Sequence, residues 1–354
     1  MRICFVSHSN AHFTRPYVDY FANAGCEVHL ISAPRDDLPN AINHHPLDRE
    51  FNPRKERLSY FWMHRSVRRM IREIDPDVLH AHYLSSNGLM AALTGFHPLV
   101  VTAHGSDVFD YSRSRLRRTL IRFVMRRADL VNPVSRELEQ SIRDLGVPQN
   151  KIFRATFGID IDRFETQRPA QRSGPVRLIC TRNLRPVYQN DRIIPALAML
   201  RDRDVEFEFT FAADGECEND LRSAIKQAGL DRQVRFLGGF TQDELPALLA
   251  GAEVYVSASA WDGTSICLLE AMASGLFPVV SAISSNSAWL DGARDALFFD
   301  PLHAEQLADC LQRAIEDTAL RQGAVAALRD RVRAEGDRNT NMRQLFAHYK
   351  RLCN

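Results

Sequence analysis

Short apolar runs alternate with longer amphipathic stretches along most of the chain. The first five runs are rich in β-branched and other apolar residues and read RICFV, CEVHLI, DVLHAH, LVVTAHG and ADLVNPVS. Runs of this length, bounded by polar segments, are typical of strands that are buried on both faces of a parallel sheet. A second series repeats the rhythm with VRLICT, FEFTFAA, VRFLG, AEVYVSAS and FPVVSA. The pattern therefore predicts an α/β chain with two doubly wound, Rossmann-like domains.

Residues 165–175 (ETQRPAQRSGP) separate the two series of runs. This stretch is polar, contains Pro, Gly and Ser and shows no hydrophobic periodicity, as expected of an interdomain linker. We therefore predict a first domain over residues 1–164 and a second domain over residues 176–336. Doubly wound sheets bind ligands beyond the carboxyl ends of their strands, so we expect the two domains to face each other across a cleft.

The last segment, residues 337–354, has the apolar pattern of an amphipathic helix. Its apolar side chains recur at intervals of three and four positions and are Met342, Leu345, Phe346, Tyr349 and Leu352. We predict a closing helix that crosses back onto the first domain.

Composition and charge exclude several classes of protein. A length of 354 residues with 45% hydrophobic residues leaves room for two cores, and a net charge of +1 argues against a dedicated nucleic-acid binder. The seven scattered cysteines include no C-x-x-C pair, so neither a disulfide framework nor a zinc site is expected. No apolar run is long enough for a signal peptide or a membrane span, and no G-x-G-x-x-G follows the first strand. We expect a cytoplasmic protein without a nicotinamide cofactor.

The stretch SAWDGTSICLLEAMASG, residues 259–275, carries the clearest candidate chemistry. Thr264 or Ser265 is expected to cap a helix that Gly275 ends, and the free N–H groups at such a helix start attract phosphate. Glu270 lies roughly 8 Å along this helix, about as far as a nucleotide's ribose lies from its phosphates. A carboxylate there can accept hydrogen bonds from both ribose hydroxyls. From spacing alone, a structural glutamate satisfied by a neighbouring side chain is an equal alternative.

The segment from Asp262 through seven residues to Glu270 (EAMASG) resembles the E-x7-E element of retaining glycosyltransferases of family 4, which have the two-domain GT-B fold. Further pieces of the resemblance follow in the family's order and are HAHYLSSNGLMA, VVTAHGSD, FGIDIDRF, TRNLRPVY and VRFLGGFTQDELPALLAGAEVYVSAS. The resemblance covers nearly the whole chain. It implies transfer of a sugar, with retention, from a nucleotide diphosphate donor, UDP-sugar by default, to a carbohydrate or lipid-linked acceptor.

The resemblance also implies roles for individual residues. His104, Arg182 and Asp262 are the catalytic candidates, with His104 beside the reacting sugar and Arg182 on the leaving diphosphate. The donor-binding candidates, with Glu270 on the ribose, are Arg182, Tyr188, Asp262, Gly263, Thr264, Ser265 and Glu270. No cofactor is implied.

This chain departs from the family pattern at three places. Tyr188 stands where a Lys is usual and brings one hydrogen bond but no charge, which leaves the diphosphate to Arg182, the helix start and Arg185. Asp262 replaces the usual Glu and shortens that side chain by one methylene. The glycine-rich turn after the first strand is replaced by SHSNAHFTR, and the acceptor-side candidates there are Asn10, His12 and Arg15.

The sequence gives weaker evidence for metal ligands than for a nucleotide site. Three D-x-D triplets occur, none directly after a strand in a nucleotide-binding setting; they are Asp75/Asp77, Asp160/Asp162 and Asp202/Asp204. His80 and His82 share a strand face, but no third ligand is evident, which favours histidines at a loop edge or in the cleft. We therefore predict no metal site.

A basic segment, residues 113–128 (RSRLRRTLIRFVMRRA), combines arginines with an apolar helical face. Leu116, Leu120, Phe123 and Val124 form this face, in the pattern of a helix that lies on a membrane surface. A solvated charged face is the alternative, and the family's lipid-linked acceptors favour peripheral contact with the inner membrane.

Two other functions fit the same residues. A GT-B sugar-nucleotide epimerase would need no acceptor, and product analysis with donor alone would reveal it. A non-catalytic nucleotide-sugar-binding scaffold, suggested by Tyr188 and Asp262, would bind donor without turnover.

Overall fold

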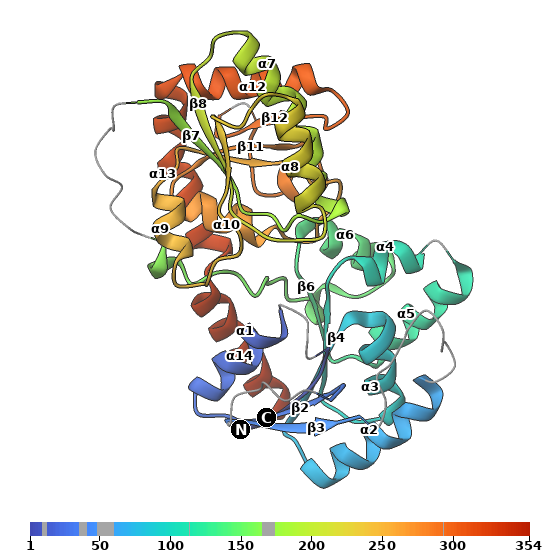
Figure 1. Cartoon of the computed structure of the whole chain (residues 1–354). Helices are drawn as coiled ribbons and strands as arrows, with labels where there is room; N and C mark the ends of the chain where they lie inside the picture. Colours follow the sequence, from blue (N-terminus) through green and yellow to red (C-terminus); the bar gives the residue numbers. More distant parts are fainter. Residues whose placement is uncertain (9–12, 35–40, 48–59, 113, 165–173, 293) are drawn as a thin grey trace. The chain divides into compact units, whose positions relative to one another are not determined.

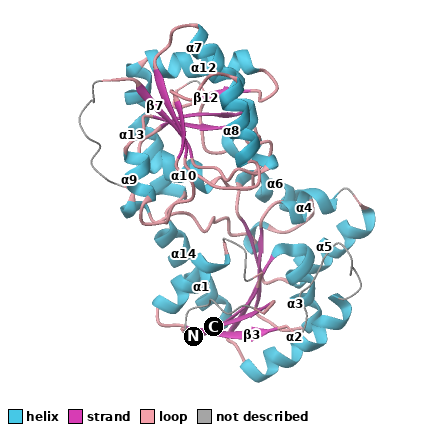
Figure 2. Ribbon diagram, viewed as in Figure 1, coloured by secondary structure: helices cyan, strands magenta, loops and turns pink. Residues whose placement is uncertain are grey.

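The computed structural model describes residues 1–8, 13–34, 41–47, 60–112, 114–164, 174–292 and 294–354 (Figure 1). Contacts divide the chain into two compact units. Unit 1 comprises Met1–Phe157 and Asn339–Asn354, and unit 2 comprises Gly158–Arg338. Each unit contains a six-stranded sheet in which all pairs of strands are parallel, with helices on both faces (Figure 2). The predicted α/β architecture of two Rossmann-like domains is confirmed.

The sheet of unit 1 has the strand order β3-β2-β1-β4-β5-β6. Its strands are β1 (Arg2–Val6), β2 (Glu27–Ser32), β3 (Ile42–Pro46), β4 (Val78–His82), β5 (Leu99–Ala103) and β6 (Leu130–Pro133). Its helices are α1 (Thr14–Asn23), α2 (Tyr60–Ile74), α3 (Gly88–Thr94), α4 (Ser106–Ser112), α5 (Arg115–Arg127), α6 (Arg136–Asp144) and α14 (Arg338–Cys353), with short turns η1 (Tyr83–Asn87) and η2 (Gln149–Lys151). Chain order reverses between β1 and β4, the point at which doubly wound sheets place their ligands.

The closing helix α14 packs in unit 1 beside α1 (Figure 1). Tyr349 is fully buried, its ring stacks on Phe21 of α1 at 5.2 Å, and its hydroxyl hydrogen-bonds His80 Nδ1 at 2.5 Å. A buried tyrosine needs a partner for its hydroxyl, and His80 supplies it. The last helix is therefore joined to the centre of the first sheet.

Unit 2 repeats the architecture with the strand order β12-β11-β10-β7-β8-β9. Its strands are β7 (Val176–Cys180), β8 (Phe207–Phe211), β9 (Val234–Phe236), β10 (Val254–Ser257), β11 (Phe277–Ser281) and β12 (Leu297–Phe299). Its helices are α7 (Ile193–Asp202), α8 (Glu218–Gln227), α9 (Leu245–Ala250), α10 (Ile266–Ala273), α11 (Ser284–Ser287), α12 (Ala304–Glu316) and α13 (Thr318–Glu335), with turns η3 (Ile161–Arg163), η4 (Pro186–Tyr188) and η5 (Asn190–Arg192). Helix α12 packs on α7, and α13 packs on α10.

The chain passes into unit 2 at Gly158, ahead of the expected boundary at residue 164. Ile159, Ile161 and Phe164 are buried in the hydrophobic core of unit 2. The backbone of Ile159 also exchanges hydrogen bonds of 2.9 and 2.8 Å with Gly336 and Arg338. Periodicity showed that these residues are apolar but not which core they join. Of the expected linker, only Gly174 and Pro175 lie within the described residues.

Across the described segments, none of the helices combines the length and the apolar character needed to cross a membrane.

Candidate functional site

In unit 2, α10 is the helix that the stretch of residues 259–275 predicted. It begins just after the loop that follows β10. Ser265 has extended backbone angles and its hydroxyl accepts a hydrogen bond from the N–H of Leu268 at 3.3 Å, so Ser265 is the N-cap. Gly275 lies just past the end of the helix with φ +73°, a conformation that favours glycine. The sequence predicted either Thr264 or Ser265 as the N-cap, and in the structure the N-cap is Ser265.

Arg182 lies two residues beyond β7 and is 6% exposed. Its guanidinium forms a salt bridge with the Asp262 carboxylate, and its Nε donates to Ser259 Oγ at 3.3 Å. The guanidinium carbon lies 4.2 Å from the centre of the Tyr188 ring. Tyr188 therefore contacts the flat face of Arg182 through a cation–π interaction, where the sequence analysis expected a hydrogen-bond donor toward the diphosphate.

Two neighbouring loops hold the Arg182 segment in place. The N–H of Leu184 donates to the carbonyl of Asp214 at 2.9 Å, and the N–H of Cys217 donates to the carbonyl of Leu184 at 2.9 Å. Gly215 has φ +155°, and a Cβ there would lie 2.4 Å from the Leu184 carbonyl oxygen, so only glycine fits. The N–H of Ala260 donates to the carbonyl of Val187 at 3.0 Å, which joins the loop of Tyr188 to that of Asp262.

Glu270 is 6% exposed on α10. Burial raises its pKa from 4.5 to about 8, while the charges of Arg338, Arg182 and Arg163 lower it by a smaller amount. Within the described part of the chain, its carboxylate receives no hydrogen bond. A buried carboxylate without such a bond is costly, and a ligand that donates hydrogen bonds would relieve the cost.

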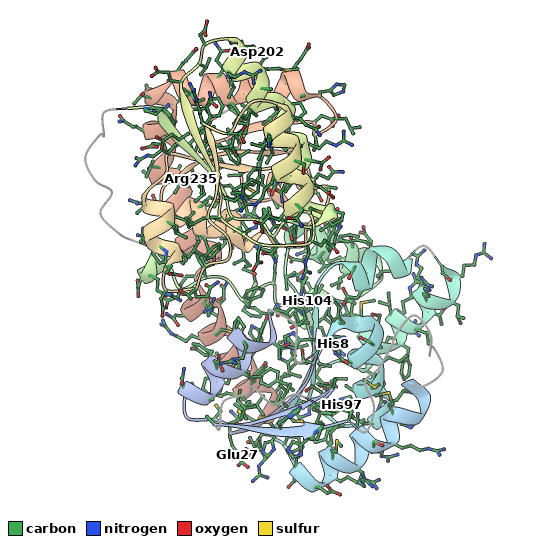
Figure 3. The ribbon with its side chains drawn as sticks, viewed as in Figure 1. His8, Glu27, His97, His104, Asp202 and Arg235 are labelled. Atoms are coloured by element: carbon green, nitrogen blue, oxygen red, sulfur yellow. The ribbon has the colours of Figure 1, made fainter. Side chains whose placement is uncertain are left out.

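In unit 1, His104 follows β5 at the carboxyl edge of the sheet (Figure 3). Asp107, 1% exposed, accepts the backbone N–H groups of His104 at 3.1 Å, Gly105 at 2.9 Å and Leu84 at 2.7 Å. Burial raises the pKa of Asp107 to about 6, although these bonds oppose the shift. Asp107 thus ties the loop after β5 to the turn after β4.

Aromatic rings surround His104. Phe13 stacks on it with ring centres 3.9 Å apart, and the ring of Tyr83 lies at 4.9 Å. Tyr83 has φ +72°, an uncommon backbone angle for a bulky residue and one that clusters at functional sites. His82 Nδ1 lies 3.0 Å from His104 Nε2.

His80 and His82 are fully buried in β4, which corrects the expectation of histidines at a loop edge or in a cleft. His80 Nε2 hydrogen-bonds Thr102 Oγ1 at 2.7 Å, and the other ring nitrogen bonds Tyr349. Among the residues that the structure describes, no three His, Cys, Asp or Glu side chains are grouped as metal ligands.

Of the remaining predicted site residues, two are exposed and two lie outside the described residues. Arg185 is exposed after β7, and Arg15 is exposed on α1, where it pairs with Asp19 at 2.9 Å. Asn10 and His12 lie outside the described residues. The sequence analysis assigned no role to Ser259 and Asp107, although Asp107 belongs to the quoted TAHGSD segment and could have been found there.

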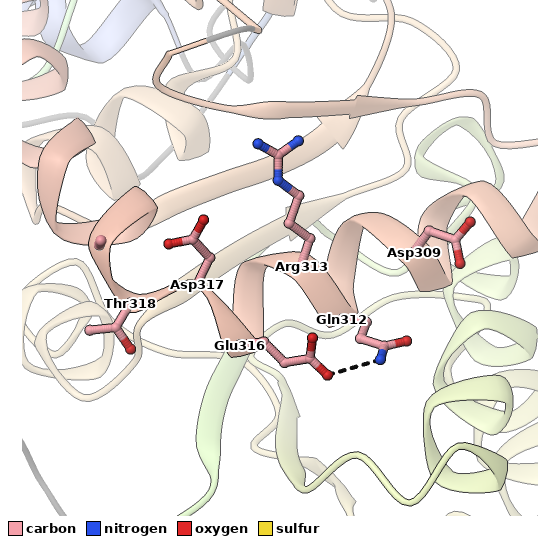
Figure 4. Close-up of a pocket in the computed structure, with 7 residues that line it drawn as sticks. Asp309, Gln312, Arg313, Glu316, Asp317 and Thr318 are labelled. Carbon is pink, nitrogen blue, oxygen red and sulfur yellow. Dashed lines mark hydrogen bonds between the residues drawn. The ribbon is translucent and has the colours of Figure 1, made fainter.

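A cavity of about 630 Å³ lies where α12 meets α13 (Figure 4). Several of its side chains already have partners: Gln312 donates to Glu316 at 2.8 Å, Asp317 accepts the N–H of Leu320 at 2.8 Å, and Asp309 pairs with Arg203. None of the predicted donor-binding residues lines it. We therefore regard it as a surface hollow between helices.

Comparison with known proteins gives two matches that lie in sequence order along this chain. Residues 2–135 match the Glycosyl transferase 4-like family, and residues 162–331 match the family Glycosyl transferases group 1. The two segments together span most of the chain.

Individual relatives are more distant. The chain is 28% identical over 215 residues to the putative colanic acid biosynthesis glycosyltransferase WcaL of Escherichia coli, covering 54% of this chain and 53% of the relative. It is 28% identical over 240 residues to the amylovoran biosynthesis glycosyltransferase AmsK of Erwinia amylovora, covering 64% and 57%. The chain thus spans little more than half the length of these relatives.

The fold also matches solved structures. Anabaena Alr3699/HepE in complex with UDP superposes with a TM-score of 0.82 over 99% of this chain and 100% of that chain, at 18% identity. This likeness supports the fold alone. From the two family matches and the two parallel sheets, we conclude that the chain belongs to the glycosyltransferases with the GT-B fold.

Proposed function

We propose that this protein transfers a sugar from a nucleotide diphosphate donor, by default a UDP-sugar, to a carbohydrate or lipid-linked acceptor with retention of the anomeric configuration. The observation that carries the proposal is Glu270, a buried carboxylate without a hydrogen bond among the described residues, on a helix whose start is capped by Ser265. The names of WcaL and AmsK, which refer to polysaccharide biosynthesis, and the UDP bound to Alr3699/HepE support it.

In this proposal Glu270 accepts the ribose hydroxyls, and the diphosphate lies at the start of α10 with the N–H groups of Gly263 and Thr264. The N–H of Gly263 donates to Asp262 Oδ1 at 2.9 Å, so it must exchange this partner for a phosphate oxygen when donor binds. Arg182 provides the positive charge for the leaving group. Among the described residues, its hydrogen bonds to Asp262 and Ser259 use two of the five N–H donors, so others are available to phosphate oxygens. Helix start and guanidinium together replace a metal ion as the electrophile.

Tyr188 compensates in part for the missing lysine in this scheme. Its ring lies against the guanidinium of Arg182 and favours the cation without adding a second charge. Asp262 fixes the guanidinium from the edge, so the plane of Arg182 is set before donor binds. Both residues thus act on the donor through Arg182.

We propose that His104 donates a hydrogen bond to the transferred sugar, and that Asn10, His12 and Arg15 contribute to the acceptor side. His104 stands at the carboxyl end of a parallel strand, where α/β sheets present residues to ligands. Phe13 and Tyr83 restrict the orientation of its ring.

Calorimetric titration with UDP, GDP, ADP and dTDP tests the donor assignment. Wild type should bind one of these nucleotides, and Glu270→Gln should bind it at least tenfold more weakly. The matched control is Glu305→Gln, which removes an exposed glutamate from α12 of the same unit. Equal affinity of the Glu270→Gln variant and wild type would refute the ribose contact.

Product analysis separates transfer from the alternative functions. With donor alone, an epimerase would convert the sugar nucleotide and a binding protein would leave it unchanged. With an oligosaccharide or lipid-linked acceptor, the transferase should release the nucleoside diphosphate and form an α- or β-linkage that matches the donor's configuration. Inverted product would contradict retention.

We also propose peripheral contact with the inner membrane through α5. Leu116 is 71% exposed and Phe123 is 37% exposed on this helix, and Arg118 and Arg126 are exposed beside them. The predicted apolar face is wrong for its other two residues, because Val124 is fully buried in the core of unit 1 and Leu120 packs against that core. Apolar side chains between arginines suit the boundary between headgroups and acyl chains.

A cavity of about 430 Å³ beside α5 supports the same contact. It is lined by Arg122, Met125, Arg126, Leu145, Gly146, Val147, Pro148 and Lys151. Three of these side chains are cationic, none is acidic, and the rest are mostly apolar, which suits an anionic headgroup.

Co-sedimentation with vesicles of mixed anionic and neutral lipid tests this contact. The double variant Leu116→Ser, Phe123→Ser should lose binding. Leu302→Ser, which removes a leucine that is 70% exposed in unit 2, should keep it. Equal sedimentation of all three proteins would refute the α5 assignment.

A further inference from the structure

His82 and His104 form a hydrogen-bonded pair of histidines that has no part in the proposed donor site. His82 Nδ1 and His104 Nε2 lie 3.0 Å apart, so one of them carries the proton between them. His82 is fully buried, and its other nitrogen, Nε2, has no hydrogen-bond partner among the described residues. The position of one proton on His82 therefore determines the state of both rings.

Protonation of His82 on both nitrogens is disfavoured. Burial lowers its pKa well below 6.5, and the nearby His80 and His8 lower it further. A neutral imidazole carries a single N–H, on either Nδ1 or Nε2. Two arrangements of the pair remain.

In the first arrangement, His82 Nδ1–H donates to His104 Nε2, and the orphan Nε2 of His82 is a bare lone pair. In the second, His104 Nε2–H donates to His82 Nδ1, and His82 must carry its own proton on Nε2, as a buried N–H without an acceptor. Orphaned buried N–H groups are rarer in proteins than under-satisfied acceptors. The first arrangement is therefore favoured.

The surroundings of His82 support this choice. Its ring stacks on Phe13 at 5.3 Å and on His80 at 4.7 Å, and the ring of Tyr17 meets it edge-on at 4.6 Å. The Tyr17 hydroxyl is directed to Asn132 at 3.4 Å, and both nitrogens of His80 are engaged with Thr102 and Tyr349. These neighbours leave no acceptor for an N–H at His82 Nε2.

We propose that His82 is a positioning residue that donates its Nδ1 proton to His104 Nε2 and thereby fixes the proton of neutral His104 on Nδ1. This inference rests on the proposed function for its consequence: His104 then meets the transferred sugar as a hydrogen-bond donor through Nδ1–H. The hydrogen bond made by one ring nitrogen sets the protonation of the other. A ring held in the wrong tautomer would present an acceptor where a donor is needed.

The tautomer itself is measured without any substrate. In protein labelled with ¹⁵N histidine, long-range ¹H–¹⁵N spectra distinguish protonated from bare ring nitrogens, and single variants assign the signals. We expect a protonated Nδ1 and a bare Nε2 on both His82 and His104. A protonated Nε2 on His104 in the wild-type protein would overturn the proposal, whatever the activity.

Three variants connect the tautomer to the reaction. His82→Asn keeps a side-chain amide donor and should leave His104 protonated on Nδ1, with kcat within a few-fold of wild type. His82→Phe keeps a ring but no donor, and it should give mixed His104 tautomers with kcat lower by roughly 10- to 100-fold. Its KM for the donor nucleotide should not change, because the nucleotide contacts lie on other residues. His80→Phe is the matched control, since it alters an equally buried ring of β4 that does not bond His104.

The outcomes separate this inference from the proposed function. The expected tautomers in a protein without transferase activity would contradict the proposed function and leave the hydrogen bond established. Mixed tautomers in His82→Phe with unchanged kcat would overturn the positioning role. If His82→Phe does not fold, the wild-type spectrum and His82→Asn decide the question.

Discussion

The two units present different chemistry at the carboxyl ends of their sheets. Unit 2 gathers buried charge, with Arg182 and Asp262 paired and Glu270 buried nearby on α10. Unit 1 surrounds His104 with the rings of Phe13 and Tyr83 and with neutral His82. Both regions place polar groups away from water, but of the two it is unit 2 that holds a buried cation there, because Arg182 is 6% exposed. The comparison suggests that unit 2 is suited to an anionic ligand group and unit 1 to an uncharged, hydroxyl-rich one.

Removal of the buried cation should have the largest effect. Arg182→Ala leaves the half-buried Asp262 carboxylate without its ion-pair partner and removes the charge proposed for the diphosphate. Breaking a buried ion pair costs about 3–5 kcal/mol, so we expect both a lower melting temperature and a loss of turnover of roughly 1,000-fold. The double variant Arg182→Ala, Asp262→Ala should recover stability but not activity in calorimetry and steady-state assays. Recovery of both would show that Arg182 is structural.

Removal of the His104 ring should affect the reaction more than nucleotide binding. His104→Ala loses one hydrogen-bond donor at the transferred sugar, which costs about 2.7–4 kcal/mol in comparable sites, or roughly 100-fold or more in kcat. Nucleotide affinity should stay near wild type, as measured by calorimetry, whereas the melting temperature should fall because buried His82 loses its hydrogen-bond partner and Phe13 loses its stacked ring. A kcat within a few-fold of wild type at saturating donor and acceptor would contradict a catalytic role.

Truncation of Glu270 should weaken nucleotide binding. Hydrogen bonds to a charged group are worth about 1.5–3 kcal/mol, so Glu270→Ala should bind the nucleotide roughly 10- to 150-fold more weakly. The carboxylate must be ionised to accept both hydroxyls, yet its pKa of about 8 leaves it largely protonated at pH 7. Binding at pH 7 should therefore release a proton, which titrations in buffers of different ionisation enthalpy detect. Binding without proton release would argue against the ribose contact.

The same pKa predicts how stability depends on pH. The folded state keeps a proton on Glu270 up to about pH 8, whereas the unfolded chain releases it near 4.5. Stability from this residue is thus greatest below pH 4.5 and is lost as the pH rises toward 8. Glu270→Gln should lose less stability than wild type between pH 5 and pH 8, as judged by denaturant unfolding. Parallel curves for the two proteins would place the pKa of Glu270 near its ordinary value.

The smallest effect on turnover should come from changes to Tyr188, whose ring lies against the Arg182 guanidinium. Tyr188→Phe keeps the aromatic face against the guanidinium and should change kcat by no more than a few-fold. Tyr188→Leu removes the cation–π contact and should slow transfer further, since it weakens the interaction that orients Arg182. If Tyr188→Phe were as slow as Tyr188→Leu in steady-state kinetics, the hydroxyl rather than the ring would be the functional group.

Most strands could be predicted because parallel strands buried on both faces must be continuously apolar. Two strands were not predicted: β3, which reads INHHP and is mostly polar, and β12, which reads LFF. Both lie at sheet edges, where one side of the strand is unpaired and the demand for apolar residues is weaker.

The sequence by itself determined the α/β architecture, the capped helix α10 and the likeness that selected His104, Arg182, Asp262 and Glu270. These depend on local periodicity, turn chemistry and motif order, which are present in the chain before it folds. Only the tertiary structure decided how side chains far apart in sequence meet. It paired Arg182 with Asp262 across 80 positions and placed His82 against His104 across 22 positions. Such contacts follow from strand order and register. The ion pairing and protonation of these side chains depend on distances between them, and a linear sequence pattern does not contain those distances.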